Sequence, residues 1–272
     1  MIIHTRKNKC PTIHNTQENI EILCGRINVS RDGLICIASQ PEMGKTALAL
    51  YMALEYAKKS PKAVYIFTLE MTAEQIYDRL LIMLAEVEAK TFHEKSYSSH
   101  EKERIDAAKE QLSKMNFIID DSSYLSVKQI EEKLKCVDNL GLVIIDFFQL
   151  LWPEKDTGNW EQDYFEIGRQ LKIFSMHRKI PLIFTAQLRR KTGSKKDKKR
   201  CLVDLAGTGV LEHDQDTICF IHREENDSSC EKQEKAEIII PRNKLGDCGS
   251  ITLLWKKSLI KFYDKENGDE ML

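Results

Sequence analysis

The segment that most constrains the fold of this chain is residues 39–46, which have the sequence SQPEMGKT. The apolar run Leu34–Ala38 precedes it, and the amphipathic stretch Lys45–Lys59 follows it. A turn between a strand and a helix that ends in Gly-Lys-Thr is typical of a phosphate-binding loop, because N–H groups at the start of the helix point toward phosphate oxygens. The pattern predicts an α/β protein that binds a nucleoside triphosphate.

The positions of this loop have separate expected roles in holding ATP and Mg²⁺. Gly44 lets the backbone approach closely, Lys45 supplies positive charge to the β- and γ-phosphates, and Thr46 offers a hydroxyl to Mg²⁺. Ser39 occupies the position that usually holds glycine, and a chance Gly-Lys-Thr at a strand–helix turn is the alternative interpretation. The residues predicted to bind the nucleotide are Ser39, Pro41, Met43, Gly44, Lys45, Thr46 and Ala47.

Short apolar runs alternate with longer amphipathic stretches from Gly33 onward, which predicts a mostly parallel sheet covered by helices on both faces. The runs predicted as its strands are Leu34–Ala38, Ala63–Leu69, Phe117–Ile119, Leu142–Ile145, Pro181–Ala186 and Thr217–Ile221. Three later runs are expected to close the sheet as antiparallel strands: Ala236–Ile240, Ile251–Trp255 and Leu259–Tyr263. The helices are predicted over Lys45–Lys59, from Thr72, over 100–114, from Ser126 to near Asn139, and over Trp160–His177.

Two carboxylates and one amide directly follow predicted strands. Glu70 follows the second strand, Asp146 follows the run at Leu142–Ile145, and Gln187 follows the run at Pro181–Ala186. Parallel α/β sheets bind ligands at the carboxyl ends of their strands. Asp146 is therefore expected to hold Mg²⁺ through its water shell, Glu70 to deprotonate the attacking water, and Gln187 to sense the γ-phosphate. Taken singly, Glu70 has the alternative of a helix N-terminal acid, Asp146 that of a turn residue after a strand, and Gln187 that of a surface glutamine, against which the sensor role is favoured.

The charge balance limits where nucleic acid can bind. The chain of 272 residues has 41 Lys and Arg against 42 Asp and Glu, so its formal net charge is -1. A DNA site must therefore be a local basic patch. A loop at residues 189–200 is the predicted patch, and a solvated loop is the alternative. Its basic residues are Arg189, Arg190, Lys191, Lys195, Lys196, Lys198, Lys199 and Arg200.

The ends of the chain differ in composition from its middle. Residues 1–32 are weakly periodic and are interpreted as a tail or linker, residues 33–264 as the ATPase domain, and residues 265–272 as a second tail. The first residues lack the apolar stretch of a signal peptide, and we expect a cytoplasmic protein without a membrane span. Cys36 and Cys219 lie within apolar runs and are predicted to be buried thiols.

Several stretches together resemble the ATPase domain of DnaB-type replicative helicases, in the order of that family. They are Pro41–Thr46, Leu69–Gln75, Ile145–Leu150, Gln187-Leu188, Glu212–Asp216 and Glu237–Ile240. The resemblance covers roughly residues 33–263. It implies a RecA-like P-loop NTPase fold and ATP-driven movement along single-stranded DNA in DNA replication, usually as a hexameric ring, with other replication proteins as possible partners.

The resemblance also implies residue roles. It makes Lys45 and Thr46 the ligands of nucleotide and Mg²⁺, Glu70 the catalytic base, Asp146 the Walker B carboxylate and Gln187 the sensor. In that family a basic pair on the last hairpin reaches the γ-phosphate of the neighbouring subunit, and Arg242 and Lys244 occupy those positions here. The separate amino-terminal domain of such helicases is not evident in the sequence, so self-association is expected to be weak.

Three interpretations of function compete. The first is an ATP-hydrolysing, DNA-stimulated motor of a phage, plasmid or other mobile replicon. The second is a nucleotide-gated DNA-binding or helicase-partner protein with weak ATPase activity and no unwinding. The third is a recombinase-like ATPase on the same fold, which the sequence around Glu70 and Gln149 disfavours.

Overall fold

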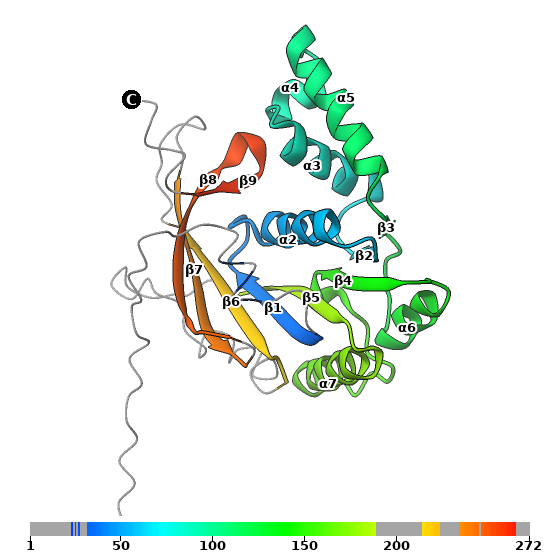
Figure 1. Cartoon of the computed structure of the whole chain (residues 1–272). Coiled ribbons are helices and arrows are strands. Elements are labelled where there is room, and N and C mark those ends of the chain that lie inside the picture. Colours follow the sequence, from blue (N-terminus) through cyan, green and yellow to red (C-terminus); the bar gives the residue numbers. More distant parts are fainter. Residues whose placement is uncertain are drawn as a thin grey trace, which may run out of the picture.

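A mixed sheet of nine strands runs through the part of the chain that the structure describes (Figure 1). The structure is a computed structural model, and it describes residues 23, 25, 27, 32–188, 214–223, 234–244 and 246–264. The strand order in the sheet is β3-β2-β4-β5-β1-β6-β7-β8-β9. The strand with the predicted phosphate loop, β1, lies between β5 and β6, so the loop leaves the middle of the sheet.

The first six strands pair in parallel and the last three pair antiparallel, as the sequence predicts. The strands β1, β2, β4 and β5 are buried almost end to end because helices cover both faces. The parallel strands are β1 (Gly33–Ser39), β2 (Ala63–Thr68), β3 (Phe117–Asp120), β4 (Leu140–Asp146), β5 (Pro181–Gln187) and β6 (Thr217–Arg223). The antiparallel strands are β7 (Glu234–Asn243), β8 (Gly249–Lys256) and β9 (Lys261–Tyr263).

Helices cover the two faces of the sheet unequally (Figure 1). On one face lie α2 (Lys45–Lys59), α3 (Ala73–Ala85), α4 (Ala89–Glu94) and α5 (Ser99–Ser113). On the other lie α6 (Val127–Lys135) and α7 (Trp160–Arg178). The predicted capping boxes are present at Thr72 and Ser126, each of which accepts a hydrogen bond from the N–H three residues on, and Ser98 starts α5 in the same way.

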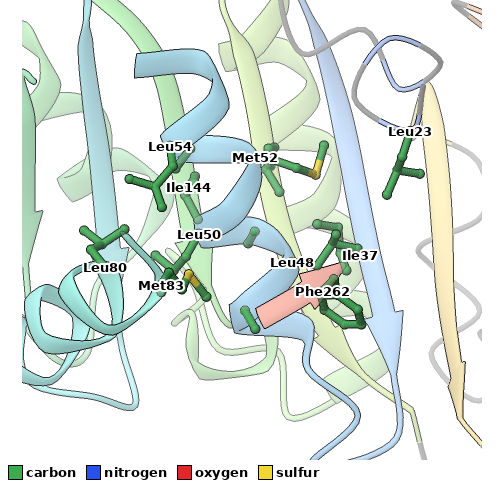
Figure 2. Close-up of a cluster of buried hydrophobic side chains, with 14 of the residues drawn as sticks. Leu23, Ile37, Leu48, Leu50, Met52, Leu54, Leu80, Met83, Ile144 and Phe262 are labelled. Atoms are coloured by element: carbon green, nitrogen blue, oxygen red, sulfur yellow. The ribbon is translucent and has the colours of Figure 1, made fainter. Parts of the chain in front are cut away.

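Each face of the sheet has its own hydrophobic core. Figure 2 shows the first, in which Leu48 and Leu50 of α2 share a cluster with Ile37 of β1, Leu80 of α3 and Phe262 of β9. Fully burying one such side chain stabilises the fold by about 2 kcal/mol. The second core joins α6 and α7 to the sheet. Cys36 and Cys219 are buried as predicted, and burial raises the pKa of both thiols.

The structure corrects the sequence prediction at two boundaries. The helix from Ser126 ends at Lys135 rather than near Asn139, because Asn139 adopts a positive φ of 54° and β4 begins at Leu140. The last strand begins at Lys261 rather than Leu259, because one 3-10 turn, η3 (Lys257–Leu259), precedes it and Ile260 also has a positive φ.

The segment predicted as a tail contributes to the first core. Leu23 and Ile27 are helical, fully buried and part of the same cluster as α2. The start of the ATPase domain at Gly33 stays a prediction, but at least these two side chains pack with it.

Candidate nucleotide site

The phosphate loop leaves β1 in the middle of the sheet edge where the parallel strands end. Ser39, the last residue of β1, lies in register with Gln187 of β5, and Thr68 of β2 lies in register with Asp146 of β4. The N–H of Leu188 donates to the carbonyl of Ser39 over 2.8 Å, which ties the two strand ends together. The site residues were predicted from separate parts of the sequence. They therefore lie at one edge of the sheet, where the parallel strands have their carboxyl ends.

Gly44 is required by both conformation and space. Its φ is +98°, in the left-handed region that side chains other than glycine rarely adopt. A Cβ at this position would lie 2.9 Å from the ring of Phe262 in β9. The last strand of the domain thus buttresses the phosphate loop, and the backbone at Gly44 stays bare on that side.

Lys45 begins α2 and its ammonium group turns back toward the loop. Its Nζ donates to the carbonyl of Gln40 over 3.4 Å. Burial lowers the pKa of Lys45, while the carboxylates of Asp146 and Glu70 oppose that shift. The influence of both carboxylates on one ammonium group indicates that the predicted cation, Mg²⁺ ligand and base share one site.

Asp146 is the buried carboxylate of this site. It is only 3% exposed and accepts hydrogen bonds from the hydroxyls of Thr46, over 2.8 Å, and of Thr185 in β5. A hydroxyl and a carboxylate are ligands that fit Mg²⁺, which binds with one or two protein oxygens plus phosphates and water. Among the described residues there is no group of three or more His, Cys, Asp or Glu side chains that would bind a metal by itself. Sequence reasoning did not identify Thr185, whose role depends on β5 pairing with β4.

Glu70 lies just beyond the end of β2 and is exposed. The N–H of Leu69 donates to the carbonyl of Asp146 over 2.7 Å, and the hydroxyl of Thr68 bonds to Met71, so the turn that carries Glu70 is fixed to the neighbouring strand. A carboxylate held beside the phosphate loop and open to solvent has the placement that a general base needs.

Arg79 is a functional candidate that sequence reasoning missed. It lies on α3 and is half-buried, and burial lowers its pKa while Asp146 and Glu70 raise it. Both carboxylates of the site therefore favour the charged form of the Arg79 guanidinium. The only sequence signal was its position nine residues after Glu70. That position does not tell where the side chain points unless the packing of α3 is known.

Gln187 is exposed at the end of β5 and is held through its backbone by Gln149. The side-chain amide of Gln149 donates to the carbonyl of Gln187 over 2.9 Å and accepts from its N–H over 3.1 Å. Both hydrogen bonds use the backbone of Gln187, so its side chain takes no part in them. Gln149 lies in η1 (Phe148–Leu150), directly after β4, so it connects the ends of the two strands that carry Asp146 and Gln187.

Aromatic and cationic side chains flank the loop on the side of the antiparallel strands. Arg223 donates to the carbonyl of Glu42 over 3.0 Å, and its guanidinium lies 5.0 Å from the ring centroid of Trp255. Trp255 in turn packs against Phe262, with their ring centroids 4.6 Å apart. Within the described part of the chain the buried Nε1 of Trp255 has no hydrogen-bond partner. Sequence reasoning missed this wall because its members come from β6, β8 and β9.

The predicted basic pair, Arg242 and Lys244, lies toward the opposite edge of the sheet. Arg242 pairs with Ile218 near the start of β6, and β6 runs parallel to β1. The ammonium group of Lys244 lies 3.3 Å from the carboxylate of Asp216. The structure therefore does not bring this pair to the phosphate loop of its own chain. The predicted DNA contacts at residues 189–200 lie outside the described residues.

Asp216 anchors this opposite edge. It accepts hydrogen bonds from the N–H of Leu34, over 2.9 Å, and from the ammonium groups of Lys172 and Lys244. Burial by itself would raise the pKa of Asp216, but the bonds from Lys172, Leu34 and Lys244 outweigh it and hold the pKa below its ordinary value.

We expect Asp216→Asn to lower the free energy of unfolding by about 2 kcal/mol at pH 7, because a buried acceptor for two ammonium groups loses its charge. Since the folded pKa is depressed, the stabilisation is present above the unfolded pKa of about 4 and is lost as the pH falls below it. Urea unfolding at pH 7 and at low pH measures the difference. Asp106→Asn, which removes an exposed ion pair with Lys109, should have little effect. Equal stability of wild type and Asp216→Asn at pH 7 would contradict the assignment.

Fold and site together define a P-loop nucleotide-binding protein of RecA-like architecture, with a nucleotide site at the carboxyl edge of a mostly parallel sheet. A family model described as the DnaB-like helicase C-terminal domain matches residues 27–264. The chain belongs to that family, as its sequence motifs predict.

Curated relatives are named as replicative DNA helicases. The chain is 32% identical over 241 residues to "Replicative DNA helicase DnaC" of Bacillus subtilis, with 87% of this chain and 53% of that protein covered. It is 31% identical over 239 residues to "Probable plasmid replicative DNA helicase" of Chlamydia psittaci, with 87% of this chain and 52% of that protein covered. The chain thus spans about half the length of these relatives. The predicted membership of the DnaB-type helicase family is confirmed.

Solved structures agree with the fold. A structure titled as an ATPase domain matches with a TM-score of 0.77 and 27% identity, over 86% of this chain and 85% of that one. "The Structure Of A DnaB-Like Replicative Helicase And Its Interactions With Primase" matches with a TM-score of 0.80 and 26% identity, over 93% of this chain and 62% of that one. No helix among the described residues has the length and hydropathy needed to cross a bilayer.

Proposed function

We propose that this chain hydrolyses ATP with Mg²⁺ and uses the reaction to act on single-stranded DNA during replication, in the setting of a phage, plasmid or other mobile replicon. The observation that carries the proposal is the meeting of Lys45, Thr46, Asp146 and Glu70 at one sheet edge, where Thr46 and Asp146 are directly hydrogen-bonded. The relatives are named as replicative helicases, which supports the proposal that ATP hydrolysis is used to act on DNA.

The proposed reaction transfers the γ-phosphoryl group of ATP to water. Glu70 orients the water and accepts its proton while the water oxygen attacks the γ-phosphorus and the bond to the β–γ bridging oxygen breaks. Lys45 stabilises the negative charge on the phosphate oxygens. The hydroxyl of Thr46 and the carboxylate of Asp146 would hold Mg²⁺, which prefers oxygen ligands, and the bound ion would neutralise negative charge on the phosphates.

Arg79 is proposed as a positioning residue for the two carboxylates. A guanidinium whose positive charge interacts with both Glu70 and Asp146 reduces the electrostatic repulsion between them.

The opposite placement of Arg242 and Lys244 supports action between subunits. Two residues at the far edge of the sheet can reach a γ-phosphate only on another copy of the chain, so we propose a homo-oligomer in which each copy supplies this pair to the next. Other replication proteins are possible partners, and one structural neighbour is titled for its interactions with primase.

A second candidate function is a nucleotide-gated DNA-binding protein with weak ATPase activity. The observation that favours this alternative is that the ammonium group of Lys244, one member of the predicted basic pair, lies 3.3 Å from Asp216 of its own chain. The two functions share the nucleotide site and differ in turnover.

The proposal predicts Mg²⁺-dependent ATP hydrolysis that rises several-fold when single-stranded DNA is added, because the sensor strand end at Gln187 would couple DNA to the γ-phosphate. The measurement is phosphate release by the full chain with and without oligothymidylate, and with Mg²⁺ removed by a chelator as control. Lys45→Ala should abolish both rates. Binding of ATP and DNA without turnover would favour the second candidate, and absence of ATP binding would contradict both.

A further inference from the structure

An open groove lined by exposed aromatic side chains lies beside the nucleotide site and has no part in the chemistry above. It has a volume of about 570 Å³ and is lined by side chains that include Gln149, Leu150, Trp152, Trp160 and Tyr164. A second hollow of about 520 Å³ continues from it and shares Tyr124 and Trp152. We propose that this groove binds unpaired nucleobases of single-stranded DNA by stacking, an inference that rests on the proposed function.

The exposure of the aromatic side chains is unusual for a folded domain. Tyr124 is 70% exposed, Trp152 51% and Trp160 41%. The rings of Tyr124 and Trp152 lie 5.6 Å apart between centroids and at an angle of 58°, so they leave faces open to solvent rather than closing on each other. Trp and Tyr side chains on a surface are the platforms on which single-stranded nucleic acids stack their bases, whatever the sequence.

The backbone holds these rings in place. The N–H of Trp152 donates to the carbonyl of Leu125 over 3.0 Å, and the same residue forms a β-bridge with Ser126. Tyr124 adopts a positive φ of 61°, which a bulky side chain rarely does. The two rings therefore project from backbone that is fixed on the α6 side of the sheet. A ligand can stack on them at little cost in the conformational entropy of the protein.

The charges of the groove favour bases over phosphates. Lys128 and four carboxylates line the two hollows. Three of the carboxylates already accept hydrogen bonds from backbone N–H groups: Asp156 from Gly158, Asp163 from Thr157 and Glu154 from Lys128. A net acidic lining repels phosphate but not the neutral bases, so the strand's phosphates are expected outside the groove. Stacking of this kind releases few counterions and should depend only weakly on salt.

The position of the groove connects it to hydrolysis. Gln149 lines the groove and holds the backbone of Gln187 through both atoms of its amide. Leu69 lines it as well and directly precedes Glu70. A base in the groove therefore contacts side chains that adjoin the predicted sensor and the predicted base, so DNA binding and γ-phosphate state can influence each other there.

The test compares a base-bearing oligothymidylate strand with an abasic strand of the same length, in binding to the full chain. We expect wild type to bind the base-bearing strand about tenfold more tightly, as one stacked base would give. Trp152→Leu should remove that preference by lowering the affinity for the base-bearing strand only. The affinity should fall by the same factor at low and at high salt. Trp152→Phe should keep most of the preference. Tyr124→Ser, at a more exposed position, should show a smaller loss in the same direction.

The control variant is Tyr77→Ala, which removes an aromatic side chain of 40% exposure from α3, on the opposite face of the sheet. Its affinity for both strands should equal that of wild type. DNA-stimulated ATPase activity together with equal affinity for the base-bearing and abasic strands would contradict base binding in the groove and leave the proposed function standing. The same result is expected if the groove binds a protein instead. Absence of binding to either strand, together with absence of stimulation, would overturn both.

Discussion

Glu70→Gln is expected to bind ATP with wild-type affinity and to hydrolyse it about 10³-fold more slowly. A positioned general base contributes rate by removing the proton of the attacking water, and an amide of the same shape cannot accept that proton. We expect binding to survive because the proposed phosphate contacts are those of Lys45 and the loop amides, while Glu70 lies in the turn after β2 and is open to solvent. The measurements are nucleotide affinity by equilibrium binding and phosphate release at saturating ATP.

Lys45→Ala is the variant with which the ATP affinity and turnover of Glu70→Gln are compared. Lys45 is half-buried, and its positive charge is favoured by Asp146 and Glu70, so its loss should weaken ATP binding as well as turnover. Glu74→Gln is a matched control, since Glu74 is an exposed carboxylate in the first turn of α3 and is not placed in the site. Wild-type turnover by Glu70→Gln would show that another group accepts the proton.

The sequence was sufficient wherever a local pattern determines the structure. The phosphate loop has fixed strand and helix neighbours, so Lys45–Lys59 was predicted with its observed bounds. The capping boxes at Thr72 and Ser126 locate helix starts because the cap and the third residue beyond it bond to each other. Glu70 and Asp146 were brought together by one rule, that parallel strands end at a common edge.

The rest depends on contacts between distant segments, which no local pattern encodes. Arg79 reaches the site only because α3 packs where it does, and Thr185 meets Asp146 only because β5 pairs with β4. The left-handed backbone of Asn139 and Ile260 shifted two predicted boundaries, since neither residue is a glycine that would have indicated a turn. The aromatic groove joins Tyr124 to Trp152, which lie far apart along the chain, and their exposure is invisible in the sequence.

Arg242 presents the sharpest test of action between subunits. A guanidinium supplied by a neighbouring subunit can contribute about 10³-fold or more to phosphoryl transfer, because its planar fork matches the oxygens of the transferred group. Lys244 is a compact point charge, and its ammonium group already lies 3.3 Å from Asp216 within its own chain. We therefore expect Arg242, rather than Lys244, to make the contact with the neighbour's γ-phosphate.

Arg242→Ala should reduce DNA-stimulated turnover about 10³-fold and leave ATP affinity nearly unchanged, since the proposed nucleotide site of its own chain lies at the opposite sheet edge. Mixing Arg242→Ala with Glu70→Gln should restore part of the activity, because at mixed interfaces one chain supplies the guanidinium and the other the intact base. Arg178→Ala, at the exposed end of α7, is the control and should behave as wild type. Normal hydrolysis by Arg242→Ala at every protein concentration would mean that this arginine is only a solvated residue of β7, and no recovery in the mixture would mean that the site is completed within one chain.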